Sequence, residues 1–346
     1  MYLNDRRDIM NIVLDCFGGD LCPDSAVEGA IQAVGEIEDL KVTLCGDENV
    51  IAQILKDKVY DKDKIALLNA SEVITNDDAP VMAIRRKKDS SMVVALKALS
   101  NGDFDGMVSS GNTGALLVGA TLLVKLIDGV QRASLSPLLP TIYDDKNTIL
   151  VDGGANVDCK ASMLKEFAIM GSAYMSAVKG VENPKVALLN NGAEEEKGNA
   201  LTKEAHALLK QTDVNFIGNI EARDLLFGVA DVIVADGFDG NMCLKTAEGM
   251  GKAVFTLLKE FIMKGGLRAK FGYLLLKPSL RKLKKIMSSD SVGGGVFLGV
   301  KKVVVKAHGA SNALAFKNAL IRAYEMSKAD LPSKIAGALA KEAGNI

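Results

Sequence analysis

The chain has 346 residues, of which 48% are hydrophobic and 33 are glycine, and its formal net charge is -1. A chain of this length exceeds what one compact core usually holds, so we expect two lobes or one large α/β unit. The near-neutral charge gives no general field that attracts nucleic acid, and we expect no nucleic-acid partner.

No stretch of the sequence predicts a membrane-spanning helix or a targeting signal. The longest apolar run covers residues 115–124, well short of the roughly 20 residues that a bilayer span needs. Residues 1–9 are polar and mixed in charge, and they lack the apolar segment of a signal peptide. The five cysteines show no paired two-residue spacing and there are two histidines, so we expect no metal site. We therefore expect a cytoplasmic protein.

One local arrangement recurs along the chain: a short apolar run ends in a small polar or acidic residue, and a glycine turn follows. The five runs cover residues 12–15, 107–110, 149–152, 187–190 and 233–236. Apolar runs without alternation predict strands buried on both faces, and the helical patterns between them predict parallel connections. The expected fold is a three-layer α/β/α sandwich with a mostly parallel sheet. Ligands bind outside the carboxyl ends of such strands, so the pattern predicts one convergent site.

The last third of the sequence predicts a helical hairpin and a return to strands. Apolar residues recur at helical spacing over residues 244–262, a second helical pattern covers 278–287, and an apolar tip lies between them. Strands are expected near 296–298 and 303–305, followed by helices over 311–328 and 333–343. We divide the chain into an N-terminal extension, residues 1–10, and a two-lobed α/β domain, residues 11–346, which includes a basic amphipathic hairpin over 244–287.

Several familiar motifs are missing from the sequence: a G-x-G-x-x-G fingerprint, a Walker A sequence and a G-x-S-x-G elbow. The best candidate for an anion-binding loop is SSGNTGA at residues 109–115, where glycines let backbone N–H groups approach an anion. The side chains of Ser110, Asn112 and Thr113 add donors. As an isolated pattern this loop is only moderately specific.

Seven segments, taken together and in order, are similar to signatures of the phosphate acyltransferase family, over about residues 11–324. They are DCFGGD at 15–20, RKKDSSM at 86–92, SSGNTGA at 109–115, DGGANVD at 152–158, EEEKG at 194–198, VADGFDGN at 234–241 and KAHGAS at 306–311. The resemblance implies transfer of a long acyl group from an acyl carrier protein thioester to inorganic phosphate. It also implies a fold akin to isocitrate dehydrogenase and phosphotransacetylase, a homodimer, and no metal or nucleotide cofactor.

The chemistry of this transfer suits a chain without a catalytic triad. A thiol with a pKa of about 8.5 leaves readily and phosphate is already an anion, so neither a strong base nor an enzyme nucleophile is needed. Fixed N–H dipoles and lysines can hold phosphate and offset the developing charge. We expect Asn112, Lys306 and His308 to be catalytic, with Lys306 supplying charge and His308 protonating the leaving sulfur. The alternatives are a solvated lysine and a structural loop histidine.

The expected phosphate and substrate contacts come from the strand-end loops. They are Asp15, Gly18, Gly19, Asp20, Ser110, Gly111, Thr113, Asp152, Gly153, Gly154, Asn156, Asp236, Gly237 and Asn241. For the carboxylates among them, the alternative is helix capping beside a glycine turn.

The hairpin carries a strong positive charge. Residues 252–285 contain ten basic residues and one acidic residue, a net charge of +9, so the rest of the chain carries about -10. Acidic acyl carrier protein could dock here, a membrane surface could take up the apolar tip, or a second copy could pack on it. A membrane contact would bring the product to a membrane glycerol-phosphate acyltransferase. The residues expected on this surface are Lys270, Phe271, Tyr273, Leu274, Leu275, Leu276 and Arg281.

Three other functions remain open on the sequence alone. A phosphotransacetylase acting on a short acyl-CoA shares the expected fold and reaction, and a dehydrogenase of the same architecture is more distant. A catalytically inactive scaffold that binds acyl carrier protein at the membrane is the alternative from another class.

Overall fold

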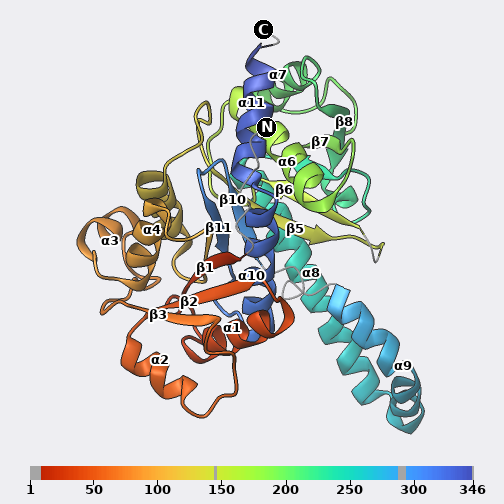
Figure 1. The fold of residues 1–346 in the computed structure, drawn as a ribbon. Coiled ribbons are helices and arrows are strands. Elements are labelled where there is room, and N and C mark those ends of the chain that lie inside the picture. The colour runs from red at the N-terminus through yellow and green to blue at the C-terminus, as the bar shows by residue number, and fades with distance from the viewer. Residues whose placement is uncertain (1–8, 144–145, 287–293, 345–346) are drawn as a thin grey trace.

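The computed structural model describes residues 9–143, 146–286 and 294–344. Within these ranges the strands form one continuous sheet of 11 strands, in the order β3-β2-β1-β4-β11-β10-β5-β6-β9-β7-β8 (Figure 1). The strands are β1 (Met10–Asp15), β2 (Leu40–Gly46), β3 (Ile65–Asn69), β4 (Gly106–Ser109), β5 (Ser134–Pro140), β6 (Asn147–Val151), β7 (Lys185–Asn190), β8 (Asn215–Glu221), β9 (Val232–Val234), β10 (Gly295–Leu298) and β11 (Val303–Lys306).

Helices cover both faces of this sheet (Figure 1). They are α1 (Asp24–Glu36), α2 (Glu48–Leu55), α3 (Pro80–Arg86), α4 (Ser91–Asn101), α5 (Thr113–Gly119), α6 (Ala161–Lys179), α7 (Ala200–Leu209), α8 (Gly237–Lys264), α9 (Gly266–Ile286), α10 (Ala313–Lys328) and α11 (Leu331–Gly344). A π-helical turn, η1 (Ala120–Val124), extends α5, and a 3-10 turn, η2 (Ala222–Asp224), follows β8. No helix in the described ranges combines the length and the apolar composition that crossing a membrane requires.

Alternate residues of the central strands enter separate apolar cores. In β1, Ile12 and Leu14 join the core under α1, α6 and α10, whereas Val13 joins the core under α3, α4 and α5. In β9, Ile233 enters a third core, on which Leu244 of α8 packs. Side chains alternate across a strand, so a fully apolar run is buried on both faces. The three-layer α/β/α fold expected from the sequence is confirmed.

The sheet reverses direction in its middle, which the sequence did not predict. β1, β4 and β11 are parallel, but β10 is antiparallel to both β11 and β5, and β5 is antiparallel to β6. β6, β9 and β7 then run parallel to one another and opposite to β1, β4 and β11. The carboxyl ends of the two groups therefore lie at opposite edges of the sheet. The five glycine turns do not share one edge, because β5 and β10 reverse the direction between them.

α8 and α9 leave the body of the molecule as a pair of neighbouring helices (Figure 1). α8 has 28 residues, a length of about 42 Å at 1.5 Å per residue. The segment expected to form a tip, 265–277, is helical from Gly266 onward, and Pro278 lies inside α9. A proline often begins a helix, which is why the sequence suggested a start there. The leucines, lysines and arginine before it are good helix formers and continue the helix.

Candidate active site

The carboxyl ends of β1, β4 and β11 place three polar side chains in one row. Asp15 pairs with Ser109, and Ser109 pairs with Lys306 on the other side. The Asp15 carboxylate is buried and accepts hydrogen bonds from the hydroxyls of Ser109 and Ser91, each at 2.6 Å. Burial raises its pKa, and the two hydroxyls partly oppose that shift. Asp15 therefore anchors the floor of the site and is not exposed to a ligand.

Two glycines let the three strand-end loops touch. A Cβ on Gly18 would lie 2.6 Å from Cα of Gly111, and one on Gly19 would lie 2.4 Å from Oγ of Ser110. The neighbouring N–H of Asp20 donates to the carbonyl of Gly309 at 2.8 Å. Neither distance to a Cβ is tolerable, so only glycine allows the loop after β1 to pack between the other two.

The ammonium group of Lys306 is buried between two of these loops. Its Nζ donates to the carbonyl oxygen of Ser110 at 3.1 Å and to that of Ala307. No carboxylate within the described residues forms an ion pair with it. Burial lowers its pKa to about 8, while the charges of Asp15 and Asp20 act in the opposite direction. Because an ammonium has three N–H bonds, one remains for a ligand.

Lys306 lies in the wall of a cavity of about 1410 Å³. Its polar part is formed by the loops after β4 and β11, with Ser110, Gly111, Thr113, Lys306, His308 and Ser311. Its apolar part lies between β5 and α8, with Leu138, Leu139, Ile142, Leu244, Phe255 and Leu258. One end of a long, mostly apolar molecule can therefore reach the polar part while the rest lies along α8.

The backbone N–H groups of the loop after β6 all donate to acceptors inside the protein. The Asp152 carboxylate accepts from the N–H groups of Gly154, Ala155 and Asn156 at 2.8–3.0 Å. The N–H of Gly153 donates to the carbonyl of Leu135 at 2.6 Å. These groups are not free to bind phosphate, contrary to the expected oxyanion pocket. Gly153 and Gly154 still line the cavity.

The start of α8 is packed onto this loop. The Asp236 carboxylate caps the helix by accepting from the N–H groups of Phe238 and Asp239. The N–H of Gly237 donates to the carbonyl of Asn156 at 2.7 Å, and a Cβ on Gly237 would lie 2.7 Å from the backbone of Asn156. Asp236 therefore caps a helix, which was the alternative role for the strand-end carboxylates.

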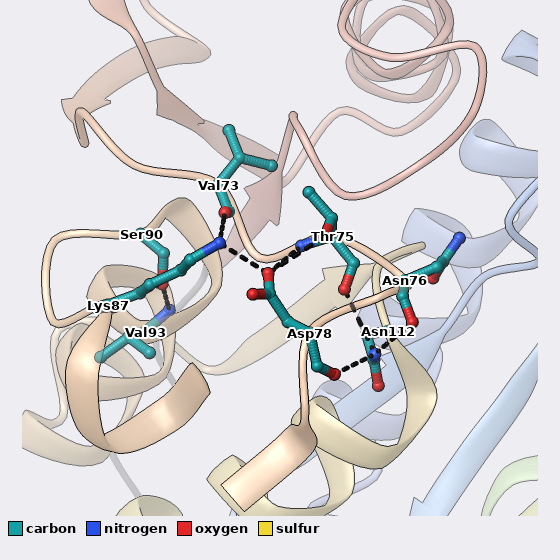
Figure 2. A network of polar contacts seen from close by, with 8 residues as sticks. All are labelled: Val73, Thr75, Asn76, Asp78, Lys87, Ser90, Val93 and Asn112. Atoms are coloured by element: carbon teal, nitrogen blue, oxygen red, sulfur yellow. Dashed lines mark hydrogen bonds and ion pairs between the residues drawn. The ribbon is translucent and has the colours of Figure 1, made fainter. Parts of the chain in front are cut away.

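Asn112 faces a neighbouring loop (Figure 2). Its amide group donates to the carbonyls of Thr75, Asn76 and Asp78, each at 3.3 Å, and its Oδ1 accepts from the N–H of Ala115 at 3.0 Å. The Asp78 carboxylate is held in turn by Lys87 at 2.6 Å, a contact that lowers the pKa of Asp78. Asn112 thus caps α5 and fixes residues 75–78, of which Asn76 lines the cavity.

Comparisons with known sequences show which family this chain belongs to. A family model described as Fatty acid synthesis protein matches residues 10–334. A Phosphate acyltransferase of Clostridium botulinum (strain ATCC 19397 / Type A) is 49% identical over 314 residues, which cover 91% of this chain and 93% of that protein. Another from Geobacillus thermodenitrificans is 45% identical over 322 residues, 93% of this chain and 96% of that protein.

The chain belongs to the phosphate acyltransferase family. It is accordingly an acyltransferase, as the resemblance in its motifs implied. Solved structures agree on the fold: a phosphotransacetylase from Streptococcus pyogenes superposes with a TM-score of 0.61 at 18% identity, covering 94% of this chain and 95% of that one. One from Staphylococcus aureus gives 0.59 at 16% identity, covering 93% and 94%.

In this phosphate acyltransferase the residues expected for the site fall into two groups. Those that line the cavity are Ser110, Gly111, Thr113, Gly153, Gly154, Asn241, Lys270, Tyr273, Lys306 and His308. Those that support its walls without lining it are Asp15, Gly18, Gly19, Asp20, Asn112, Asp152, Asn156, Asp236 and Gly237. On the outer surface of α9 lie Phe271, Leu274, Leu275 and Leu276. The side chain of Arg281 is outside the described part of the chain.

Sequence reasoning missed the contributions of β5, Asn76 and Ser311. β5 contains Pro137 and Pro140, which lack an N–H and are rare inside a sheet, so it did not resemble a central strand. Ser311 lay at the end of the KAHGAS segment, and Asn76 lay in none of the seven segments. The sequence did predict a helix that begins near residue 311 after a strand, and this pattern could have indicated that Ser311 lies at a strand-end loop of the site.

The contacts of Asn112 predict the effect of removing its side chain. Asn112→Ala loses the cap of α5 and the anchor of residues 75–78, so the free energy of unfolding should fall by about 1–2 kcal/mol. The catalytic efficiency of acyl transfer should also fall, because Asn76 and the 111–114 backbone lose their fixed positions. Urea unfolding and steady-state kinetics measure the two effects.

Asn199→Ala is the matched control, since Asn199 caps α7 through the N–H of Thr202 at 2.9 Å, away from the cavity. This variant should lose stability and keep its kinetics. If Asn112→Ala kept wild-type stability yet lost activity, Asn112 would act on the substrate itself.

Proposed function

We propose that this enzyme transfers a long-chain acyl group from the thioester of acyl carrier protein to inorganic phosphate, giving an acyl phosphate for phosphatidic acid synthesis. The observation that carries the proposal is one cavity with two unlike parts: a buried lysine held by carbonyls, and an apolar wall between β5 and α8. A cytoplasmic location, with product handed to a membrane glycerol-phosphate acyltransferase, is part of the same proposal.

Phosphate is assigned to the polar part of the cavity. The backbone N–H groups of Thr113 and Gly114 have no acceptor within the described part of the protein, and Lys306 adds a positive charge without a carboxylate in contact. Donors with no protein acceptor, next to a cation of low exposure, favour an anion.

The acyl chain is assigned to the apolar part. Each methylene group removed from water contributes about 0.8 kcal/mol, which is roughly a fourfold gain in affinity per carbon. A donor with a long chain therefore binds this cavity far better than an acetyl donor. The same argument disfavours a phosphotransacetylase for short acyl-CoA, although the two share a fold.

The reaction is a direct displacement. An oxygen of hydrogen phosphate attacks the thioester carbonyl carbon, a C–O bond forms, and the carbonyl oxygen takes the electron pair. The pair returns, the C–S bond breaks, and the thiolate leaves with the proton that the phosphate carried. Lys306 and the loop amides offset the negative charge during these steps.

His308 is assigned to the leaving sulfur. Its Nδ1 accepts from the N–H of Ala310 at 3.4 Å, so the neutral ring carries its proton on Nε2. The side chain is exposed and lines the cavity, where Nε2–H can donate a hydrogen bond that stabilises the departing thiolate until the sulfur takes up the proton released by phosphate.

A product assay tests the function. Incubation of the enzyme with palmitoyl-loaded acyl carrier protein and phosphate should produce acyl phosphate, detected as a hydroxamate after trapping. An acetyl-CoA donor should be turned over far less efficiently. Turnover that favoured acetyl-CoA would assign the enzyme to phosphotransacetylases. If no donor gave a product, the catalytically inactive scaffold would be the better interpretation.

The lowered pKa of Lys306 predicts an alkaline limit to activity. The ammonium form predominates below pH 8 and is lost as the pH rises through that value, so the kcat/KM for phosphate should fall above pH 8, by up to tenfold per unit. In Lys306→Arg the charge persists at high pH, and the limit should move upward or vanish. Lys306→Met should lose most activity at every pH. A limit that remained near pH 8 in Lys306→Arg would belong to another group.

The hairpin presents two different surfaces. Five lysines line the cavity from α8 and α9: Lys245, Lys252, Lys259, Lys270 and Lys277. We assign this side to acidic acyl carrier protein, because its thioester must enter the same cavity.

The outer side of the hairpin is apolar. On α8 Met250, Val254 and Phe261 are 56–68% exposed, and on α9 Leu274 and Leu275 are 61% and 68% exposed. Apolar surface of this extent marks a contact site. We assign the α8 residues to a homodimer and the α9 leucines to peripheral contact with an anionic membrane.

Sedimentation with vesicles separates these assignments. Serine at Leu274, Leu275 and Leu276 should abolish binding to phosphatidylglycerol vesicles and leave the dimer and the transfer reaction intact. Met250→Ser with Val254→Ser is the control, which should weaken the dimer in light-scattering measurements and keep vesicle binding. If wild-type protein does not sediment with the vesicles, the membrane assignment is wrong.

A further inference from the structure

Two buried hydroxyl groups have no hydrogen-bond partner within the described residues, those of Tyr174 and Ser311. Tyr174 lies in α6, inside an apolar core. Ser311 is 2% exposed and lines the cavity that contains Lys306. Buried polar atoms in folded proteins nearly always have a partner, so the hydroxyl of Ser311 is available to a molecule that enters this cavity.

The backbone around Ser311 is fixed, so the hydroxyl has a defined position. Its N–H donates to the carbonyl of His308 at 3.0 Å and closes a turn, and the carbonyl of Gly309 accepts from the N–H of Asp20 at 2.8 Å. The next residue, Asn312, caps α10 by accepting from the N–H of Ala315 at 3.0 Å. Both sides of Ser311 are therefore held by hydrogen bonds that do not use its side chain.

The surroundings of this hydroxyl favour a negatively charged ligand. α10 has 16 residues, and Ser311 lies just before its first turn, where the helix dipole is positive. Lys306, five positions earlier, directs its ammonium to carbonyl oxygens rather than to a carboxylate. A hydroxyl donor in the same cavity as these positive groups matches an anion rich in acceptor oxygens.

We propose that Ser311 is a phosphate-binding residue, whose Oγ donates a hydrogen bond to the phosphate that Lys306 attracts. The inference rests on the proposed function and adds one residue to the phosphate site. Ser311 orients the anion from the α10 side of the cavity, which the loop at residues 110–114 also lines. The hydroxyl contributes to the affinity for phosphate and does not contribute to the stability of the fold.

Ser311→Ala tests this role. In phosphate-free buffer its melting temperature should equal or exceed that of the wild type, because an unpartnered buried hydroxyl is removed. Isothermal titration with inorganic phosphate should give a dissociation constant about tenfold or more higher, as expected for losing a hydrogen bond to a charged group. The KM for phosphate should rise similarly while the KM for the acyl donor stays unchanged.

Ser327→Ala in α10 is the matched control, because Oγ of Ser327 donates to the carbonyl of Asp105 at 3.2 Å. It should melt at a lower temperature and bind phosphate like the wild type. Three results would overturn the proposal: unchanged phosphate affinity in Ser311→Ala, a melting temperature in phosphate-free buffer lowered as in Ser327→Ala, or a rise confined to the KM of the acyl donor. Failure of the wild type to make acyl phosphate would count against the proposed function alone, since phosphate binding is measured separately.

Discussion

The burial of one ammonium group governs the arrangement of this site. Lys306 is the last residue of the central strand β11, and its side chain points between two loops, where it contacts the carbonyl oxygens of Ser110 and Ala307. Carbonyl dipoles keep a buried charge tolerable without cancelling it, whereas a carboxylate in contact would neutralise it. The positive charge that remains is available to a substrate. The burial that makes it effective also lowers its pKa toward the physiological range.

The reversal of the sheet explains why the cavity joins two chemically different parts. Where β4 and β11 end, the loops expose amides, hydroxyls and the lysine. Beyond β10, strand β5 runs in the same direction as β11 and is followed by the antiparallel β6, so side chains of β5 form an apolar wall beside Gly153 and Gly154 of the loop after β6. α8 covers that surface with leucine and phenylalanine. A polar pocket is thereby placed next to an apolar wall on one continuous sheet.

The sequence predicted the local elements well and the long-range pairing poorly. Unbroken apolar runs such as Ile149 to Val151 identify buried strands, because each residue must meet a core on its own face. The direction of those strands depends on β5, whose prolines make it unlike a central strand, and on β10, whose partner β5 lies more than a hundred residues away in the sequence. Likewise, the sequence identified Asn112 and Asp152 as polar residues beside glycines. It could not indicate that their hydrogen-bonding groups are taken up by carbonyls and amides of neighbouring loops.

That distinction between occupied and unoccupied donors is the basis of the proposed anion site. Around Asp152 every N–H of residues 153–156 has an acceptor inside the protein. Across the cavity, the described N–H groups of Thr113 and Gly114 and the hydroxyl of Ser311 have none. Leaving a buried donor such as the Ser311 hydroxyl unpaired costs about 1–3 kcal/mol. A ligand that pairs it recovers this free energy, whereas the loop after β6, whose N–H groups are all paired, offers no such gain. The two glycine-rich loops therefore differ in their free hydrogen-bonding groups although their sequences look alike: one shapes the cavity wall, and the other is the loop that we propose binds the charged substrate.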